Sequence, residues 1–454
     1  MRKLSRMAPA SFMIAVICSA TIAMAAPSTA KIRYNALLVR VTPRTTLADE
    51  PMHISVVGVA PNRNVTLQLE TWDADGQAWR SWARFQATRN GTVDLDRAAP
   101  IAGTYRGVDG MGLFWSMQQS SGRPAFFYFP RSSAAQYSVT ASSGGRAYSA
   151  SFFRVLMSGV GATDLNGPVF GRAFEPQTAK VRAGVVFVGG SGGGHPWDAD
   201  SALLASRGYE TVSLDYYDYH DPKPGLPRQL VSIPVESVLN AITWMKNRPG
   251  MSGKPFVVIG HSRGSELALL AAVQSPDIRG AVGLSPSPIV WPGLPYPFTG
   301  KDVTAWTLGG SAVPFAPSEG FWERGQAAHQ GQLQIFATAF ESALKSNCGC
   351  SIDIWNIRGP TLMLYGRDDQ VWPASLFVQT IEDELRAHGR SFQDRAIGYA
   401  DAGHFMFEPY VPQQHRITIN YPSGPVNFGG TAAGDARAAV GAWQEILRFL
   451  ASVR

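Results

Sequence analysis

A serine stands at the centre of the pentapeptide Gly260-His261-Ser262-Arg263-Gly264. The apolar run from Pro255 to Ile259 before it predicts a strand, and the segment from Glu266 to Val273 after it predicts a helix. A glycine-flanked serine between a strand and a helix is typical of a nucleophile elbow, whose tight turn projects the hydroxyl from the sheet. Glycines keep side chains away from such a strained turn. We therefore predict that Ser262 is a nucleophile.

A serine hydroxyl needs a base to remove its proton and an acid to orient that base. In folds with this elbow the chain order is Ser, acid, His. His404 follows a strand predicted from Ala396 to Tyr399 and is the predicted base. The acid is expected after the preceding strand, where two aspartates are adjacent. Asp369 is the preferred acid, and Asp368 and Asp401 are the alternatives.

The tetrahedral intermediate of acyl transfer needs two backbone N–H groups that face its oxyanion. The N–H of Arg263, directly after the nucleophile, is the first candidate. The second is expected from Gly190, Ser191 or Gly192, within a glycine run that follows an apolar strand. A phosphate-binding loop is excluded, because no Gly-Lys-Ser/Thr sequence closes the run. This chemistry needs no cofactor and no metal ion.

The sequence around these residues has two different patterns of predicted secondary structure, and a chain of 454 residues is long enough for two domains. Residues 165–454 alternate strands with helices, which predicts an α/β-hydrolase fold: a mostly parallel sheet with helices on both faces. Residues 32–157 contain short alternating strands separated by turns, which predicts an all-β, immunoglobulin-like sandwich. Residues 286–356 are rich in Pro, Gly and aromatic residues, and we interpret them as a lid over the active site, with a decorative insertion as the alternative.

The N-terminus carries three basic residues, an apolar run from Phe12 to Met24 and the small residues Ala23-Met24-Ala25. This pattern predicts a cleaved signal peptide over residues 1–25, with an uncleaved anchor as the alternative. The mature protein would then be periplasmic or secreted, with no stable membrane span. There Cys348 and Cys350 could form a small disulfide ring, whereas two cysteines without a nearby histidine disfavour a zinc site.

The charge balance argues against nucleic acid as a partner. The chain has 40 Lys and Arg against 34 Asp and Glu, a formal net charge of +6, and no Lys/Arg-rich block. So weak a balance implies no nucleic-acid surface. The predicted partner is therefore a small-molecule acyl substrate.

Several stretches resemble one known family, the acyl-CoA thioesterases related to bile acid-CoA:amino acid N-acyltransferase. Those similar to its N-terminal β-sandwich domain are Asp49-Glu50-Pro51, Gly91 to Leu95, and Gly103 to Ser116. Those similar to its hydrolase domain are Leu203 to Tyr209, Gly260 to Leu270, Gly366 to Trp372, and Gly403-His404. The resemblance therefore covers both predicted domains.

The resemblance implies a triad of Ser262, Asp369 and His404 and the transfer of an acyl group from a thioester. Family members that conjugate acyl groups to amino acids carry cysteine as the nucleophile, so serine at position 262 favours water as the acceptor. We therefore expect a serine hydrolase of acyl thioesters that acts through an acyl-enzyme. The alternatives are an exported carboxylesterase acting on a non-CoA ester, an acyl-CoA:amino acid N-acyltransferase, and a non-catalytic binding protein.

Overall fold

The computed structural model describes residues 36–453 except 123–125, 131–133, 222, 298–300, 318–331, 407, 414–417 and 422–423. Residues 1–25, the predicted signal peptide, lie outside the described residues. In the described part, no helix is long and apolar enough to cross a membrane.

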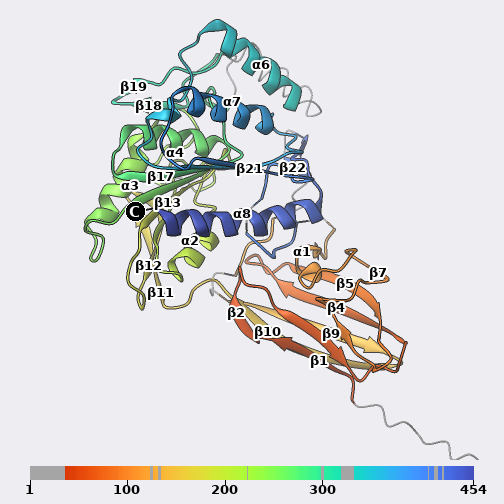
Figure 1. Ribbon diagram of the computed structural model, residues 1–454. Coiled ribbons are helices and arrows are strands. Elements are labelled where there is room, and N and C mark those ends of the chain that lie inside the picture. The colour runs from red at the N-terminus through yellow and green to blue at the C-terminus, as the bar shows by residue number, and fades with distance from the viewer. Residues whose placement is uncertain are drawn as a thin grey trace, which may run out of the picture.

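The N-terminal part folds into two packed sheets (Figure 1). The first has the order β1 (Leu38–Thr42), β3 (His53–Val57), β6 (Val93–Asp94). The second has the order β2 (Thr45–Leu47), β10 (Arg146–Val155), β9 (Ala134–Ser143), β4 (Asn64–Trp72), β5 (Ala78–Gln86), β7 (Ala102–Gly103), and β8 (Gln118–Gln119) also pairs with β5. Buried and accessible residues alternate along β4 and β5, because successive side chains of a strand point to opposite faces. The short helix α1 (Gly112–Trp115) is entirely buried.

The C-terminal part is built on one large sheet. Its order is β11 (Val160–Asn166), β12 (Phe170–Pro176), β14 (Glu210–Leu214), β13 (Gly184–Val188), β16 (Phe256–His261), β17 (Ile278–Leu284), β20 (Thr361–Gly366), β21 (Arg395–Tyr399). From β14 to β21 every neighbouring pair is parallel, and β11 and β12 add an antiparallel edge. Strands β13 and β14 are buried at every residue, which explains the unbroken apolar sequence of β13, whereas β14 also buries Glu210, Thr211 and Ser213.

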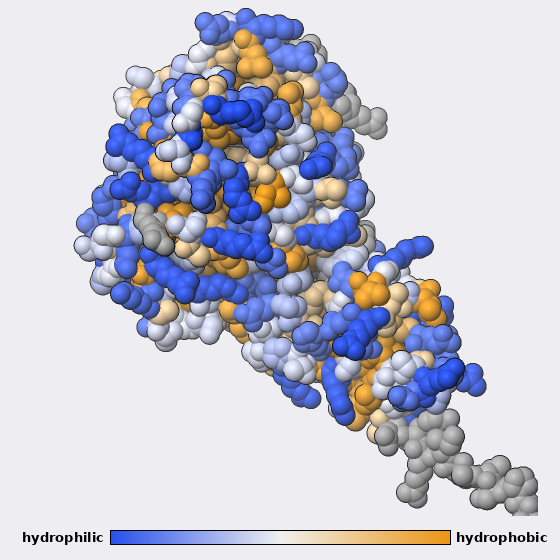
Figure 2. Space-filling view, in the orientation of Figure 1, coloured by the Kyte–Doolittle hydropathy of each residue, from blue (hydrophilic) through white to orange (hydrophobic). Residues whose placement is uncertain are grey.

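Helices cover both faces of this sheet, as predicted (Figure 1). One face packs against α2 (Asp198–Ala205) and α8 (Ala432–Ser452). The other packs against α3 (Glu236–Lys246), α4 (Arg263–Gln274) and α7 (Ala374–Ala387). The molecule is therefore an α/β-hydrolase preceded by a β-sandwich, which confirms the predicted fold class. Hydrophilic residues cover most of the surface seen in Figure 2, and apolar residues also reach it over the sandwich.

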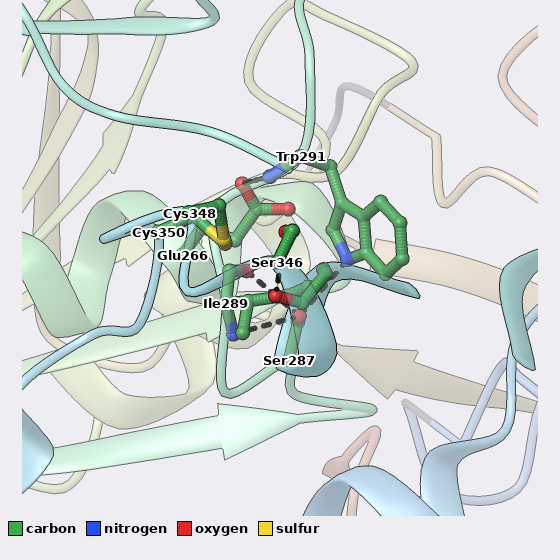
Figure 3. Close-up of a disulfide and its surroundings, with 8 residues drawn as sticks. Glu266, Ser287, Ile289, Trp291, Ser346, Cys348 and Cys350 are labelled. Carbon is green, nitrogen blue, oxygen red and sulfur yellow. Dashed lines mark hydrogen bonds between the residues drawn. A yellow bond between two sulfur atoms is a disulfide. The ribbon is translucent and has the colours of Figure 1, made fainter. Parts of the chain in front are cut away.

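The segment between β17 and β20 has elements of its own. They are β18 (Trp306–Leu308), β19 (Ser311–Ala312), α6 (Gln332–Ser346) and the 3₁₀ turn η1 (Ile354–Asn356), and β18 also pairs with β15 (Ile233–Pro234). Aromatic side chains of this segment form a small core together with α7. A disulfide joins Cys348 to Cys350 next to the turn from Ser287 to Ile289 (Figure 3). A hairpin of β22 (Thr418–Tyr421) and β23 (Gly424–Asn427) precedes α8.

Candidate active site

The turn between β16 and α4 holds Ser262 in a backbone conformation that side chains rarely adopt, with φ 53° and ψ −125°. Two glycines make the turn possible by close approach. A Cβ on Gly260 would lie 2.3 Å from the carbonyl oxygen of Gly264, and a Cβ on Gly264 would lie 2.0 Å from that of Gly189. The strained serine is held by its own N–H, which donates to Leu284 O at 2.9 Å. The strand–turn–helix setting predicted for Ser262 is thus present.

The structure pairs His404 with Asp369. Nδ1 of His404 lies 2.7 Å from Oδ2 of Asp369, and both residues are buried, with 2% and 4% of their surface exposed. The other carboxylate oxygen accepts hydrogen bonds from the backbone N–H groups of Val371, at 2.8 Å, and Trp372, at 3.2 Å. A carboxylate fixed in this way can orient the imidazole and stabilise its protonated form.

The two alternative acids have other partners in the described structure. Asp368 accepts hydrogen bonds from Nε2 of Gln370 at 2.9 Å and from the backbone N–H of Gly430 at 3.0 Å. Asp401 is exposed and pairs with Arg437 at 3.4 Å. The geometry therefore favours Asp369 as the acid.

His404 lies beside the nucleophile turn. Nε2 of His261 donates to the carbonyl oxygen of His404 at 3.2 Å, and the two rings are 4.8 Å apart. Burial, together with the nearby His404, lowers the pKa of His261 well below its ordinary value. His261 therefore stays neutral and serves here as a hydrogen-bond donor between the turn and the loop that carries His404.

The glycine loop after β13 passes close to the turn at Gly189, as described above for Gly264, and at Gly190. A Cβ on Gly190 would lie 3.2 Å from Nδ1 of His261 and 3.3 Å from Cβ of Ser262. The hydroxyl of Tyr216 donates to the carbonyl oxygens of Gly189 and Gly190, at 2.8 and 2.9 Å, and so fixes this part of the loop.

Of the predicted oxyanion residues, the structure therefore brings Gly190 to the nucleophile, whereas Ser191 and Gly192 are exposed. Arg263 is the first residue of α4. Its N–H belongs to the first helical turn, where N–H groups have no partner within the helix and can face an anion.

The sequence pattern predicted a role for the backbone N–H of Arg263, and the structure adds one for its side chain. Its Nε donates to Oε1 of Glu266 at 2.6 Å, and its two terminal nitrogens donate to the carbonyl oxygens of Trp291 and Pro292, both at 2.9 Å. Burial raises the pKa of Glu266, and the charge of Arg263 opposes that shift. The signal was an Arg–Glu pair three residues apart on an otherwise apolar helix. This ion pair ties α4 to the segment between β17 and β20.

The described residues contain no group of three or more His, Cys, Asp or Glu side chains that could hold a metal ion. A histidine–carboxylate pair lies beside the turn of Ser262, and α4 begins directly after the serine with the N–H of Arg263 in its first turn. Such a set can remove a proton from a hydroxyl and stabilise an oxyanion, which is the chemistry of acyl transfer.

The fold and this site define an α/β-hydrolase that carries an N-terminal β-sandwich. Residues 49–158 match the acyl-CoA thioester hydrolase/BAAT N-terminal region, and residues 233–453 match the BAAT/acyl-CoA thioester hydrolase C terminal. The two matches describe one family and together span more than half of the chain. The chain therefore belongs to the acyl-CoA thioester hydrolase/BAAT family, as the resemblance implied.

Known proteins align with this chain over both the sandwich and the hydrolase part. The chain is 27% identical over 411 residues to peroxisomal succinyl-coenzyme A thioesterase of Mus musculus, covering 88% of this chain and 93% of that protein. It is 28% identical over 415 residues to acyl-coenzyme A thioesterase 3 of Mus musculus, covering 89% and 91%. It is 27% identical over 411 residues to mitochondrial acyl-coenzyme A thioesterase 2 of Mus musculus, covering 88% and 86%.

The prediction of a periplasmic or secreted protein is wrong by comparison with these relatives. Their names place one in the peroxisome and another in the mitochondrion. The prediction depended on the basic and apolar character of residues 1–25. Basic residues near the N-terminus occur in transit peptides as well as in secretory signals, so this character does not distinguish export from other destinations.

Proposed function

We propose that this protein hydrolyses acyl-CoA thioesters through an acyl-enzyme formed on Ser262. His404 takes the proton of the Ser262 hydroxyl as the oxygen attacks the thioester carbonyl. The oxyanion is held by the N–H of Arg263 and the N–H of Gly190 or a neighbouring residue of the glycine loop. The C–S bond then breaks, and the CoA thiolate leaves with the proton held by His404. The observation that carries this proposal is the buried Asp369–His404 pair beside the strained turn of Ser262.

The second half of the reaction uses the same residues. His404 removes a proton from water, the hydroxide attacks the acyl ester, and Ser262 regains its proton as the free acid leaves. An oxygen ester reacts less readily with amines than a thioester does, so a serine acyl-enzyme favours water over an amino acid as acceptor. The expected products are a carboxylic acid and free CoA.

We also propose that the chain divides into a sandwich domain, predicted over residues 32–157, and a catalytic domain, predicted to begin near residue 165. Strand β10 ends at Val155, and β11 (Val160–Asn166) already belongs to the catalytic sheet, which supports a boundary between these two strands, before residue 165. We retain residues 286–356 as a lid. The hydrogen bonds from Arg263 to Trp291 and Pro292 support that proposal, because they place the start of the segment against the nucleophile helix.

The test is a substrate panel on the purified protein, with CoA release followed by a thiol reagent. Acyl-CoAs of different chain lengths, including succinyl-CoA, are compared with p-nitrophenyl esters and peptides. Ser262→Ala should lower turnover by about 10⁴- to 10⁶-fold. Ser275→Ala, at the other end of α4, is the matched serine control and should leave turnover unchanged.

Acid and amide products are then quantified by mass spectrometry in millimolar glycine or taurine. Free acid supports the proposal, whereas amide as the main product would make the protein an N-acyltransferase. Cleavage of esters alone would retain the mechanism and reject the thioester substrate. Wild-type turnover by Ser262→Ala would reject the nucleophile.

A further inference from the structure

The chain that follows His404 leaves the catalytic sheet and packs on the sandwich. Val411 is buried in the hydrophobic core of the sandwich. The backbone N–H of Gln413 donates to the carbonyl oxygen of Trp115 in α1 at 2.9 Å. Nη1 of Arg154, on β10, donates to the carbonyl oxygen of Tyr410 at 2.6 Å. Figure 1 shows α1 on the side of the sandwich that faces α8. Residues 408–413, shortly after His404 in the sequence, are therefore held against the other domain.

A second connection runs through aromatic rings. Phe126 of the sandwich lies edge-on to Phe405, with ring centroids 5.3 Å apart. Phe405 in turn contacts His404 at 5.7 Å and His261 at 5.4 Å. A sandwich side chain thus packs on the ring that itself packs on the proposed base.

The burial of Arg154 costs free energy, because its charged guanidinium loses its hydration. It is fully buried, and its guanidinium lies 5.3 Å from the ring centroid of Phe114 and 5.9 Å from that of Tyr137. Burial lowers the pKa of Arg154, because a charge loses its hydration there. Among the described residues, no acceptor bonds its Nε or Nη2. An apolar side chain would fill such a core at less cost. The bond to Tyr410 O and the aromatic rings around the guanidinium are interactions that an apolar residue would not make, and of these the bond to Tyr410 is the one that reaches the chain after His404.

The loop that Arg154 holds is strained. Glu408 and Tyr410 both have positive φ, 52° and 62°, although neither is glycine. Such conformations persist only when surrounding contacts impose them. The hydrolase domain fixes the backbone of His404 itself, whose N–H donates to Phe428 O at 2.8 Å and whose carbonyl accepts from Ser285 Oγ at 3.1 Å. Both domains contact the residues that follow. Phe405 packs on Phe428, with ring centroids 4.5 Å apart, and Met406 is buried in the core between the sheet and α8. Tyr410, Val411 and Gln413 are held by the sandwich.

We propose that the sandwich domain positions His404 for catalysis, with Arg154 and Phe126 as positioning residues. Arg154 acts through residues 408–413, and Phe126 acts through the ring of Phe405. This inference rests on the proposed function, in which His404 is the base. It gives the N-terminal domain a role in turnover that requires no contact with the substrate.

The test compares two arginines that cross the same domain interface. Arg154→Met removes the bond to the His404 loop. Arg207→Met removes a bond of 2.7 Å to the buried carboxylate of Asp49, which lies outside that loop. A displacement of about 1 Å can cost on the order of 100-fold in rate. We expect Arg154→Met to lower kcat by about 10- to 100-fold with KM unchanged, while Arg207→Met leaves kcat unchanged. Labelling of Ser262 by a fluorophosphonate should slow in parallel, and Arg154→Lys should restore part of the rate.

Phe126→Ala carries the test independently, because the side chain is only half-buried and its loss does not threaten folding. It should lower kcat in the same direction. Equal kcat in Arg154→Met, Phe126→Ala and the control would overturn the inference. A rise in the KM of Phe126→Ala with no change in its kcat would also overturn it, because Phe126 would then be a substrate contact. His404→Ala separates the two proposals. If His404→Ala is inactive while both sandwich variants keep full kcat, only the positioning role fails. If His404→Ala keeps full activity, the assignment of His404 as the base and the inference about its positioning fail together.

Discussion

The carboxylate of Glu266 offers the sharpest energetic prediction. One oxygen accepts from Nε of Arg263 at 2.6 Å, and the other accepts from Trp291 N at 3.1 Å and Trp306 Nε1 at 2.9 Å. Glu266 is fully buried and Arg263 is 5% exposed. Glu266→Gln preserves the shape of the side chain, but it removes the negative charge and points an amide N–H₂ at groups that donate.

The expected cost follows from the charge that remains. Removing one partner of a buried ion pair leaves the other uncompensated and costs about 3–5 kcal/mol. A folded domain has a total free energy of unfolding of about 5–15 kcal/mol, so Glu266→Gln should lower the stability of the protein by a large fraction of that total. The bonds of Arg263 to the carbonyl oxygens of Trp291 and Pro292 stay available and do not neutralise its charge.

The assay is urea unfolding followed by tryptophan fluorescence, since Trp291 and Trp306 both contact the carboxylate. The control is Asp277→Asn, the same chemical change in an exposed pair. Asp277 lies 2.8 Å from Lys246, and each side chain is 46% exposed. Exposed pairs contribute about 0–1 kcal/mol, so this variant should unfold almost like the wild type. If both variants lose the same free energy, the reasoning from burial is refuted.

Further predictions concern the acid, the oxyanion loop and pH. Asp369→Asn should lower kcat by about 10⁴-fold, whereas Asp368→Asn should have little effect, and equal steady-state kinetics would reject the assignment. Gly264→Ala places a methyl group 2.0 Å from Gly189 O and displaces the glycine loop, so kcat should fall by about 100-fold, measured against wild type at saturating substrate. Burial raises the pKa of Glu210 from 4.5 to about 7, and Arg248 opposes that shift. This group stabilises the fold below pH 4.5 and its contribution is lost as the pH rises through about 7, so Glu210→Gln should flatten the decline in unfolding free energy over that interval.

The parts of the site that local patterns encode could be predicted from the sequence. A strand, a glycine-flanked serine and a helix are contiguous, so the conformation of Ser262 follows from its neighbours. His404 and Asp369 each follow a strand of one parallel sheet, and the carboxyl ends of such strands meet at one edge. Topology alone therefore brings these residues together.

The connections between domains could not be predicted in this way. Arg154 and Tyr410 are 256 positions apart, and no periodicity relates an arginine on a sandwich strand to a carbonyl after the catalytic sheet. The choice within the glycine loop was also beyond the sequence. Gly190, Ser191 and Gly192 are adjacent small residues in one loop, and their sequence does not show which of them lies next to the nucleophile. Only the path of the loop past His261 distinguishes Gly190 from the other two.

The two side chains that flank Ser262 explain how a strained turn can also be a rigid one. A residue in its conformation costs on the order of 1–3 kcal/mol, which surrounding contacts must supply. His261 bonds the carbonyl oxygen of His404 on one side, and Arg263 bonds Trp291 and Pro292 on the other. The nucleophile, the base and the start of the proposed lid are therefore linked through adjacent residues of one turn. Because the loop after His404 continues into the sandwich, a displacement of that domain would be transmitted to the same turn.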